Sequence, residues 1–257
     1  RSVKMSVREN VVQAKNLGKS YGAVTALDDI SFEIGRGEIV GFAGDNGAGK
    51  STLMKMVAGD VTPTTGELLV NNKTENNLTT KHAQELGISM VYQDLALCDN
   101  LEIVENIFLG RELTRFELGR FKVIDKERML TRSQELLDIL DLELPSLEEP
   151  VTALSGGQRQ LVAIARAIAF SPKLVIMDEP TAALSVKAVQ PLLGQIRRLP
   201  ETGCSVMIVS HRLSDLLDTC DRIYVLRRGN ITHEFIADNV SETELLHAIA
   251  SVYQESQ

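Results

Sequence analysis

The sequence has no tryptophan and few aromatic residues of any kind, at 4% of its 257 residues, although 44% of its residues are hydrophobic. It also has few cysteines: Cys98, Cys204 and Cys220 are odd in number and show no CxxC spacing. That pattern disfavours a disulfide framework and a zinc site, and it is typical of a protein in a reducing cytosol. The length and the hydrophobic content are sufficient for a sizeable core.

Long apolar runs and an excess of basic charge are missing from the sequence as well. No apolar run approaches the ~18 residues that a membrane span requires, and the first ten residues, RSVKMSVREN, lack the apolar segment of a signal peptide. The formal net charge is −8. A nucleic acid is therefore not an expected partner, because binding its phosphates requires a basic face. We expect a protein that is soluble when isolated, and this charge still allows a small local site for a phosphorylated ligand.

Strand-like and helix-like patterns alternate over two parts of the chain. Residues up to about 43 have the pattern of strands, and residues 62–74 have that of a turn and an edge hairpin. The alternation of apolar strands with helices resumes after residue 171. This succession predicts an α/β core formed by about residues 11–93 and 170–248.

Between these two segments the pattern becomes helical. Helices are predicted near residues 101–109 and 126–140, with a charged connection at 110–122, and no strand is expected in this part of the chain. We therefore predict an inserted α-helical subdomain at about residues 94–169, within a single domain that covers residues 1–257.

Four of the apolar strands run directly into polar residues. One is followed by GDNGAGKST, and the others are followed by Gln93, Glu179 and His211. In an open parallel sheet, ligands bind outside the carboxyl ends of the strands. Because four such ends would share one edge of the sheet, we expect them to form a single site.

Residues 44–51 match the phosphate-binding pattern G-x-x-x-x-G-K-[ST] and stand between a predicted strand and a predicted helix. The predicted nucleotide-binding residues here are Gly44, Asp45, Asn46, Gly47, Ala48, Gly49, Lys50, Ser51 and Thr52. The glycines let backbone N–H groups converge on phosphate oxygens. Lys50 would reach the β- and γ-phosphates of ATP, and Ser51 would ligate Mg²⁺. The alternative is an ordinary glycine turn, which would not require the strand–loop–helix context.

The strand LVIMD ends in two acids, Asp178 and Glu179. Beside a phosphate-binding loop, Asp178 would hold Mg²⁺, directly or through water. Glu179 would act on the attacking water, a role usually worth ~10²–10⁴-fold in rate. Taken alone, such a pair is more often a helix cap.

Three further residues acquire a function only from this context. Gln93 would contact Mg²⁺ or the attacking water, and His211 would contact the γ-phosphate in the transition state. Tyr21 would stack under the adenine, since a base on an aromatic ring gains ~1–3 kcal/mol. The ordinary alternatives are a polar residue at a strand end, a structural histidine and a surface turn residue.

The segment LSGGQ, residues 154–158, opens a predicted helix in an unusual way. Ser155 and Gln158 have the spacing of a capping box. Gly156 and Gly157 each cost up to ~1 kcal/mol relative to alanine inside a helix. Bare backbone amides at a helix start favour anion binding, but the nucleotide already has a phosphate cradle in the 44–51 loop. We therefore predict that this helix start caps the γ-phosphate bound by another copy of the chain.

In order and spacing, these motifs resemble the nucleotide-binding subunit of ABC transporters over about residues 11–248. The resemblance implies a P-loop NTPase fold, with a RecA-like core, an antiparallel β subdomain and an inserted helical subdomain. In that family's terms Tyr21 is similar to the adenine-stacking aromatic, Gln93 to the Q-loop glutamine and residues 154–158 to the signature motif; Asp178 and Glu179 are similar to the Walker B aspartate and the catalytic glutamate, and His211 to the switch histidine. Ser185 stands where the commoner form has Asp.

The segments NLEIVENIFLGRE, DEPTAALS and SHRLSD resemble the ATPases of bacterial monosaccharide importers, the ribose, xylose and fructose class. This resemblance implies an ATP-hydrolysing subunit on the cytoplasmic face of the inner membrane. It would work with transmembrane permease subunits and, through them, with a periplasmic or lipid-anchored substrate-binding protein. Either the chain forms a head-to-tail homodimer with two working sites, or it is half of a longer protein.

Two other functions fit the sequence less well than this one. A soluble ABC ATPase acting on nucleic acid or ribosomes conflicts with the acidic charge of the chain. An isolated P-loop kinase or GTPase leaves residues 155–158 without a role.

Overall fold

The computed structural model describes residues 9–250 apart from 119–120, 141, 143 and 145. Its largest sheet has six strands, five of them mutually parallel, with an antiparallel edge strand. In spatial order the strands are β12 (Asn230–Ile236), β11 (Arg222–Arg227), β3 (Ile39–Ala43), β10 (Ser205–Val209), β9 (Leu174–Asp178) and β6 (Ile88–Val91). The parallel order places the carboxyl ends of β3, β10, β9 and β6 along one edge.

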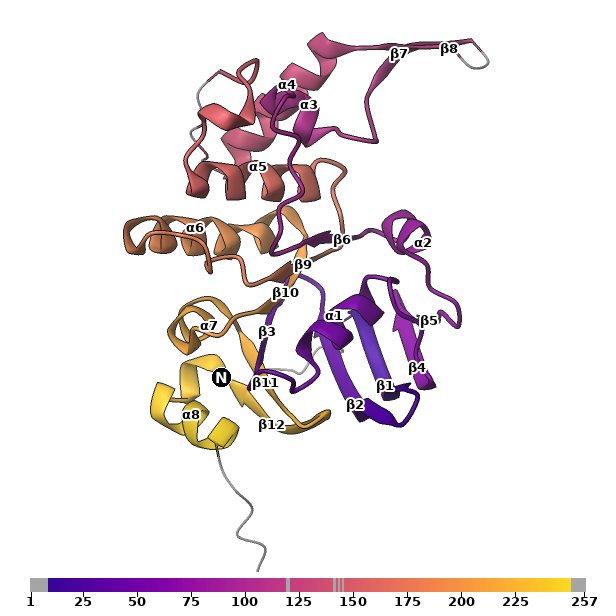
Figure 1. Ribbon diagram of the computed structural model, residues 1–257, viewed down its shortest axis with the longest axis vertical. Coiled ribbons are helices and arrows are strands. Elements are labelled where there is room, and N and C mark those ends of the chain that lie inside the picture. The colour runs from indigo at the N-terminus through magenta and orange to yellow at the C-terminus, as the bar shows by residue number, and fades with distance from the viewer. Residues whose placement is uncertain (1–8, 119–120, 141, 143, 145, 251–257) are drawn as a thin grey trace, which may run out of the picture.

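A second, antiparallel sheet has four strands (Figure 1). In spatial order they are β2 (Val24–Gly35), β1 (Asn10–Tyr21), β4 (Thr65–Val70) and β5 (Lys73–Thr74). The expected edge hairpin at residues 62–74 is confirmed by the β4–β5 pairing. Phe32 of this sheet contacts Phe42 of the larger sheet edge-to-face, with ring centroids 5.2 Å apart, so aromatic side chains join the two sheets.

Helices cover both faces of the six-stranded sheet, and others lie above it (Figure 1). The α-helices are α1 (Lys50–Val57), α2 (Thr80–Glu85), α3 (Ile103–Ile107), α4 (Lys126–Leu140), α5 (Gly156–Ile168), α6 (Val186–Arg198), α7 (Leu213–Thr219) and α8 (Glu242–Ala250). Three short 3-10 helices are η1 (Val151–Ala153), η2 (Leu199–Thr202) and η3 (Ala237–Asn239). The P-loop NTPase fold with an antiparallel β subdomain and helical insertion is confirmed, while the exact limits of the subdomains, about residues 94–169 for the helical one, stay a prediction.

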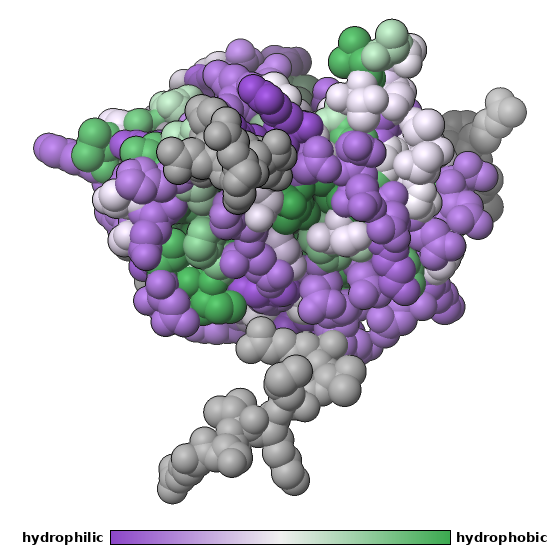
Figure 2. All heavy atoms as spheres, turned by 90° about the horizontal axis from the view of Figure 1, so that it is seen from below, coloured by the Kyte–Doolittle hydropathy of each residue, from purple (hydrophilic) through white to green (hydrophobic). Residues whose placement is uncertain are grey.

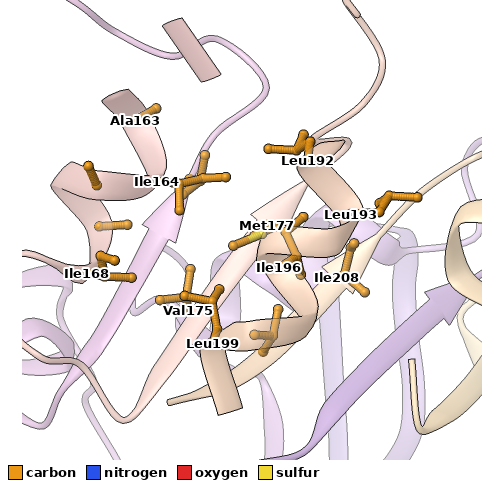
Figure 3. Packing of buried hydrophobic residues seen from close by; sticks show 14 of the residues in the cluster. Ala163, Ile164, Ile168, Val175, Met177, Leu192, Leu193, Ile196, Leu199 and Ile208 are labelled. Carbon is orange, nitrogen blue, oxygen red and sulfur yellow. The ribbon is translucent and has the colours of Figure 1, made fainter. Parts of the chain in front are cut away.

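The central strands are continuously apolar because both of their faces are buried. On β9, Val175 and Met177 pack into one core cluster and Leu174 and Ile176 into another. The first cluster includes α6, whose Ile196 lies near Met177 and Val175 in Figure 3. The second cluster fills the space between the two sheets and α1. The six-stranded sheet is therefore held between two cores, and its strand ends are held in fixed positions.

The helical insertion contains a β-hairpin that the sequence analysis did not predict. The connection at residues 110–122 was expected to lack strands, but β7 (Thr114–Leu118) pairs with β8 (Phe121–Ile124). Phe116 and Val123 pair in this ribbon and are 59% and 55% exposed. Apolar and charged residues alternate here with period two, which is the strand signal, but the charges and the small number of apolar residues obscured it.

The part of the chain that the structure describes includes no helix with the length and apolar character needed to cross a membrane. The face seen in Figure 2 is mostly hydrophilic, and its hydrophobic residues form small separate groups. Scattered surface hydrophobic residues of this kind are normal and require no partner.

Candidate nucleotide site

The four polar strand ends predicted to meet do meet. They open onto a cleft of about 230 Å³ at the carboxyl edge of β3, β10, β9 and β6. Its lining residues are Ala26, Asn46, Gly47, Gly49, Lys50, Ser51, Thr52, Gln93, Asp178, Glu179, Val209 and His211. Ala26 and Val209 were not predicted, since a small or apolar side chain without a motif has no signal in a single sequence.

The phosphate-loop residues adopt a backbone that glycine permits. Gly44 has a φ of 150°, and a Cβ there would collide with the carbonyl oxygen of Leu226 on β11. Helix α1 begins directly after this loop, with Gly49 as its N-cap. Its first N–H groups therefore point at the cleft, where an anion is stabilised by the helix dipole. Gly44, Asp45 and Ala48 belong to the loop but not to the lining of the cleft.

Lys50 is a buried cation held by the loop it follows. Its side chain is 7% exposed, and its Nζ donates to the carbonyl oxygens of Gly44 at 2.6 Å and Asp45 at 2.9 Å. Burial lowers the pKa of Lys50, and the charges of Glu179, Asp45 and Asp178 oppose that shift. Because an ammonium has three N–H donors, one donor is left for a ligand in the cleft.

Asp178 and Glu179 stand together at the end of β9, where burial raises the pKa of both carboxyl groups. For Asp178 the rise is opposed most by Lys55. For Glu179 it is opposed first by the hydrogen bond from the backbone of His211. A carboxylate with a raised pKa is a better proton acceptor near neutral pH. The cleft therefore contains two adjacent carboxyl groups, both of which bind a proton more readily than an exposed carboxyl group does.

Glu179 and His211 form a pair in the structure. The backbone N–H of His211 donates to Glu179 Oε2 at 3.1 Å, and His211 Nε2 lies 3.1 Å from Glu179 Oε1. Glu179 has a φ of 50°, which is unusual for a residue other than glycine and marks stored backbone strain. Its own N–H donates to the carbonyl oxygen of Val209 at 2.9 Å. The carboxylate is therefore aimed into the cleft by contacts from the neighbouring strand end.

Tyr21, predicted to stack under the adenine, is not among the residues that line the cleft. It is 51% exposed, and Lys19 Nζ lies 5.1 Å from the centroid of its ring. The ring is therefore a solvent-facing surface at the end of β1, and its role toward a nucleotide stays a prediction.

Residues 155–158 also lie outside the cleft lining. The capping box is confirmed: the Ser155 N–H donates to Gln158 Oε1 at 3.0 Å, and the Gln158 N–H donates to Ser155 Oγ at 3.4 Å. An added Cβ at Gly157 would lie 3.4 Å from the Cβ of Ala188, and the nearest atom to one at Gly156 is 3.8 Å away. Both are ordinary contacts, so packing within the chain does not require these glycines.

A parallel α/β sheet whose strand ends unite a glycine-rich phosphate loop, a buried lysine and two acids defines a P-loop nucleotide hydrolase. The family model described as "ABC transporter" matches residues 27–182. A nucleotide-free ATP-binding cassette from an ABC transporter superposes with a TM-score of 0.80 at 25% identity, covering 94% of this chain and 96% of that one. A dimeric cassette in a post-hydrolysis state, bound to ADP and Pi, gives 0.73 at 30% identity over 88% and 98%.

Sequence relatives point the same way. The chain is 42% identical to the xylose/arabinose import ATP-binding protein of Sulfolobus acidocaldarius, over 94% of each chain. It is 41% identical to the fructose import ATP-binding protein of Rhizobium meliloti, over 86% of each. A ribose import ATP-binding protein of Escherichia coli O157:H7 is 37% identical over 92% of this chain but only 46% of its own length. The protein belongs to the ABC transporter family, as an ATP-hydrolysing cassette.

Proposed function

We propose that this cassette provides the energy for the import of a carbohydrate, specifically a monosaccharide, through a membrane transporter. The proposal is supported by relatives named for xylose/arabinose, fructose and ribose import at 37–42% identity over most of this chain. The observation that carries the chemistry is the single cleft that unites Lys50, Asp178, Glu179 and His211. Its partners would be permease subunits and a substrate-binding protein, with the cassette at the cytoplasmic face of the membrane.

The phosphates of ATP would lie against the N-terminus of α1, with the Lys50 ammonium close to the β- and γ-phosphates. Tyr21 would stack on the adenine. Mg²⁺ fits this cleft, because Ser51, Gln93 and Asp178 contribute hydroxyl, amide and carboxylate oxygens, and Mg²⁺ prefers oxygen ligands shared with substrate phosphates. These three residues would hold the ion, which when bound neutralises charge on the phosphates.

Hydrolysis would follow from the position of Glu179. Its carboxylate accepts a proton from the water that attacks the γ-phosphorus, while the bond from phosphorus to the β–γ bridging oxygen breaks and ADP leaves. The hydrogen bond from His211 fixes the carboxylate, and the imidazole would contact the γ-phosphate as charge develops.

The binding site for the γ-phosphate would be completed by a second copy of the chain. Residues 155–158 present backbone N–H groups at a helix start, and packing within the chain does not explain the two glycines there. A phosphate oxygen approaching closely enough to accept from these amides would leave no room for side chains. Two chains arranged head to tail would then each complete the other's site.

ATP hydrolysis by the purified protein tests the chemistry. We expect Glu179→Gln to lower kcat at least 100-fold, because the amide cannot accept the proton, with ATP binding retained. The control is Glu201→Gln, at an exposed position of η2, which should hydrolyse ATP as the unchanged protein does. Hydrolysis undiminished in Glu179→Gln would contradict this assignment.

Carbohydrate import is tested in cells from which the gene has been deleted. Uptake of labelled xylose, arabinose, ribose or fructose should fall for at least one sugar and return with the intact gene but not with Glu179→Gln. Unchanged uptake of all four, together with tight retention of the protein on an RNA column at low salt, would instead support the nucleic-acid alternative.

A further inference from the structure

A buried polar pair lies behind the cleft and outside its lining. Thr181 and Asp215 are 1% and 3% exposed, and Thr181 Oγ1 donates to Asp215 Oδ2 at 2.6 Å. Thr181 follows Glu179 by two residues, and Asp215 lies on α7, four residues after His211. The pair therefore joins the two segments that carry the acid and the imidazole of the site.

Burying such a polar pair in a core costs free energy. A carboxylate loses its hydration when buried, and no ion pair to Asp215 is found among the residues that the structure describes. A hydroxyl–carboxylate hydrogen bond at this distance is charge-assisted and strong. Removing the donor would leave a buried charge without compensation. The pair thus strongly favours one arrangement of the Glu179 segment against α7.

The two segments are joined at two places. At the cleft, the His211 N–H and Nε2 contact the two oxygens of the Glu179 carboxylate. Behind it, Thr181 holds Asp215. The stretch between Glu179 and Thr181 is further closed by the Ala182 N–H, which donates to the Glu179 carbonyl oxygen at 3.1 Å. With only the first contact, α7 could pivot and carry His211 away from the acid; with both, their separation is fixed.

We propose that Thr181 and Asp215 are positioning residues for ATP hydrolysis: their hydrogen bond holds α7 against the Glu179 segment, so that His211 and Glu179 keep their mutual geometry during turnover. This inference rests on the proposed role of Glu179 and His211. Neither residue of the pair touches the cleft, so ATP affinity should not depend on it.

The test compares Thr181→Val, which keeps the shape but removes the donor, with Thr181→Ser, which keeps the donor. We expect kcat per ATP-binding site to fall about 10-fold in Thr181→Val and to stay within 2-fold in Thr181→Ser, with KM and ATP affinity unchanged in both. Asp215→Asn keeps a hydrogen-bond acceptor but loses the charge, so its kcat should lie between those of Thr181→Val and Thr181→Ser. The matched control is Thr219→Val, also buried on α7, whose hydroxyl has no hydrogen-bond partner among the described residues.

One measurement separates positioning from a merely structural role. In single turnover, Thr181→Val should have no further effect once His211 is replaced by alanine. Additive losses of the single-turnover rate in the double variant, or an unchanged kcat in Thr181→Val, would overturn the inference. If Glu179→Gln hydrolyses ATP normally, the proposed function fails instead.

Discussion

At the scale of single residues, Lys50 shows how the protein positions a binding group in advance. Its ammonium is buried and already bonded to two loop carbonyl oxygens, so it is positioned before a nucleotide arrives. A ligand phosphate gains a charge-assisted hydrogen bond without ordering a flexible side chain. The cost of burial is visible as the lowered pKa of this lysine.

Replacing Lys50 with methionine should therefore weaken ATP binding. A hydrogen bond to a charged group is worth about 1.5–3 kcal/mol, so we expect the Kd for ATP to rise at least 10-fold, measured by calorimetry. Lys81→Met, at an exposed position on α2, serves as the control and should bind as the unchanged protein does. Equal affinity in the two variants would show that Lys50 does not contact the phosphates.

The raised pKa of Glu179 predicts a pH dependence of hydrolysis. In the proposed role of base, Glu179 would act only when it is ionised, so activity should be lost as the pH falls through its pKa. Because burial raises that pKa, the acid limb should lie above the ~4.3 of an ordinary glutamate. A kcat–pH profile between pH 4 and 9 measures this, and a profile that stays flat down to pH 4 would contradict the role of Glu179.

Site residues within local motifs were predictable from the sequence, because a motif states its own geometry. The loop at residues 44–51 and the acid pair after LVIMD needed only a strand before them, and the structure brings both to the cleft. The Thr181–Asp215 pair was not predictable, because its members are 34 residues apart and neither matches a chemical pattern. Their contact depends on how α7 packs.

At the scale of elements, the hairpin β7–β8 shows where periodicity fails. Apolar and charged residues alternate regularly in this hairpin, but Phe116 and Val123 remain exposed. Because the hairpin buries no apolar face, its sequence needs few apolar residues, and the strand pattern in the sequence is weak. A two-stranded ribbon has no second layer to cover it. The long buried strands and helix α4 were predictable because burial enforces their pattern.

The start of α5 gives a prediction that separates folding from function. Gly157→Ala adds a Cβ that meets only Ala188, at 3.4 Å. Alanine also favours helix by up to ~1 kcal/mol over glycine. The variant should therefore be at least as stable to heat as the unchanged protein, yet lose most of its ATP hydrolysis, because in the proposed head-to-tail dimer the new methyl group would face the partner's phosphate. A variant with full hydrolysis would show that no ligand approaches this helix start.

At the scale of the whole molecule, two cores hold one sheet so that loops far apart in sequence meet along a single edge. The sequence predicted that four strand ends would share this edge, since parallel strands alternating with helices leave little choice. The spatial order β12-β11-β3-β10-β9-β6 was not predictable, because crossovers depend on packing between faces. Residues 154–158 lie outside the cleft, and this is the reason for the proposal that a second copy of the chain completes the site.

The most direct test of this account is the molecular mass of Glu179→Gln, measured by light scattering with Mg²⁺-free ATP and, separately, with ADP. The account predicts a dimer in ATP and a monomer in ADP, because the substitution stalls hydrolysis and the γ-phosphate joins the two chains. The dimer should be lost again when Ser155 is also changed to a bulky residue. A monomer in both nucleotides would contradict the claim that two copies of this chain complete each other's sites.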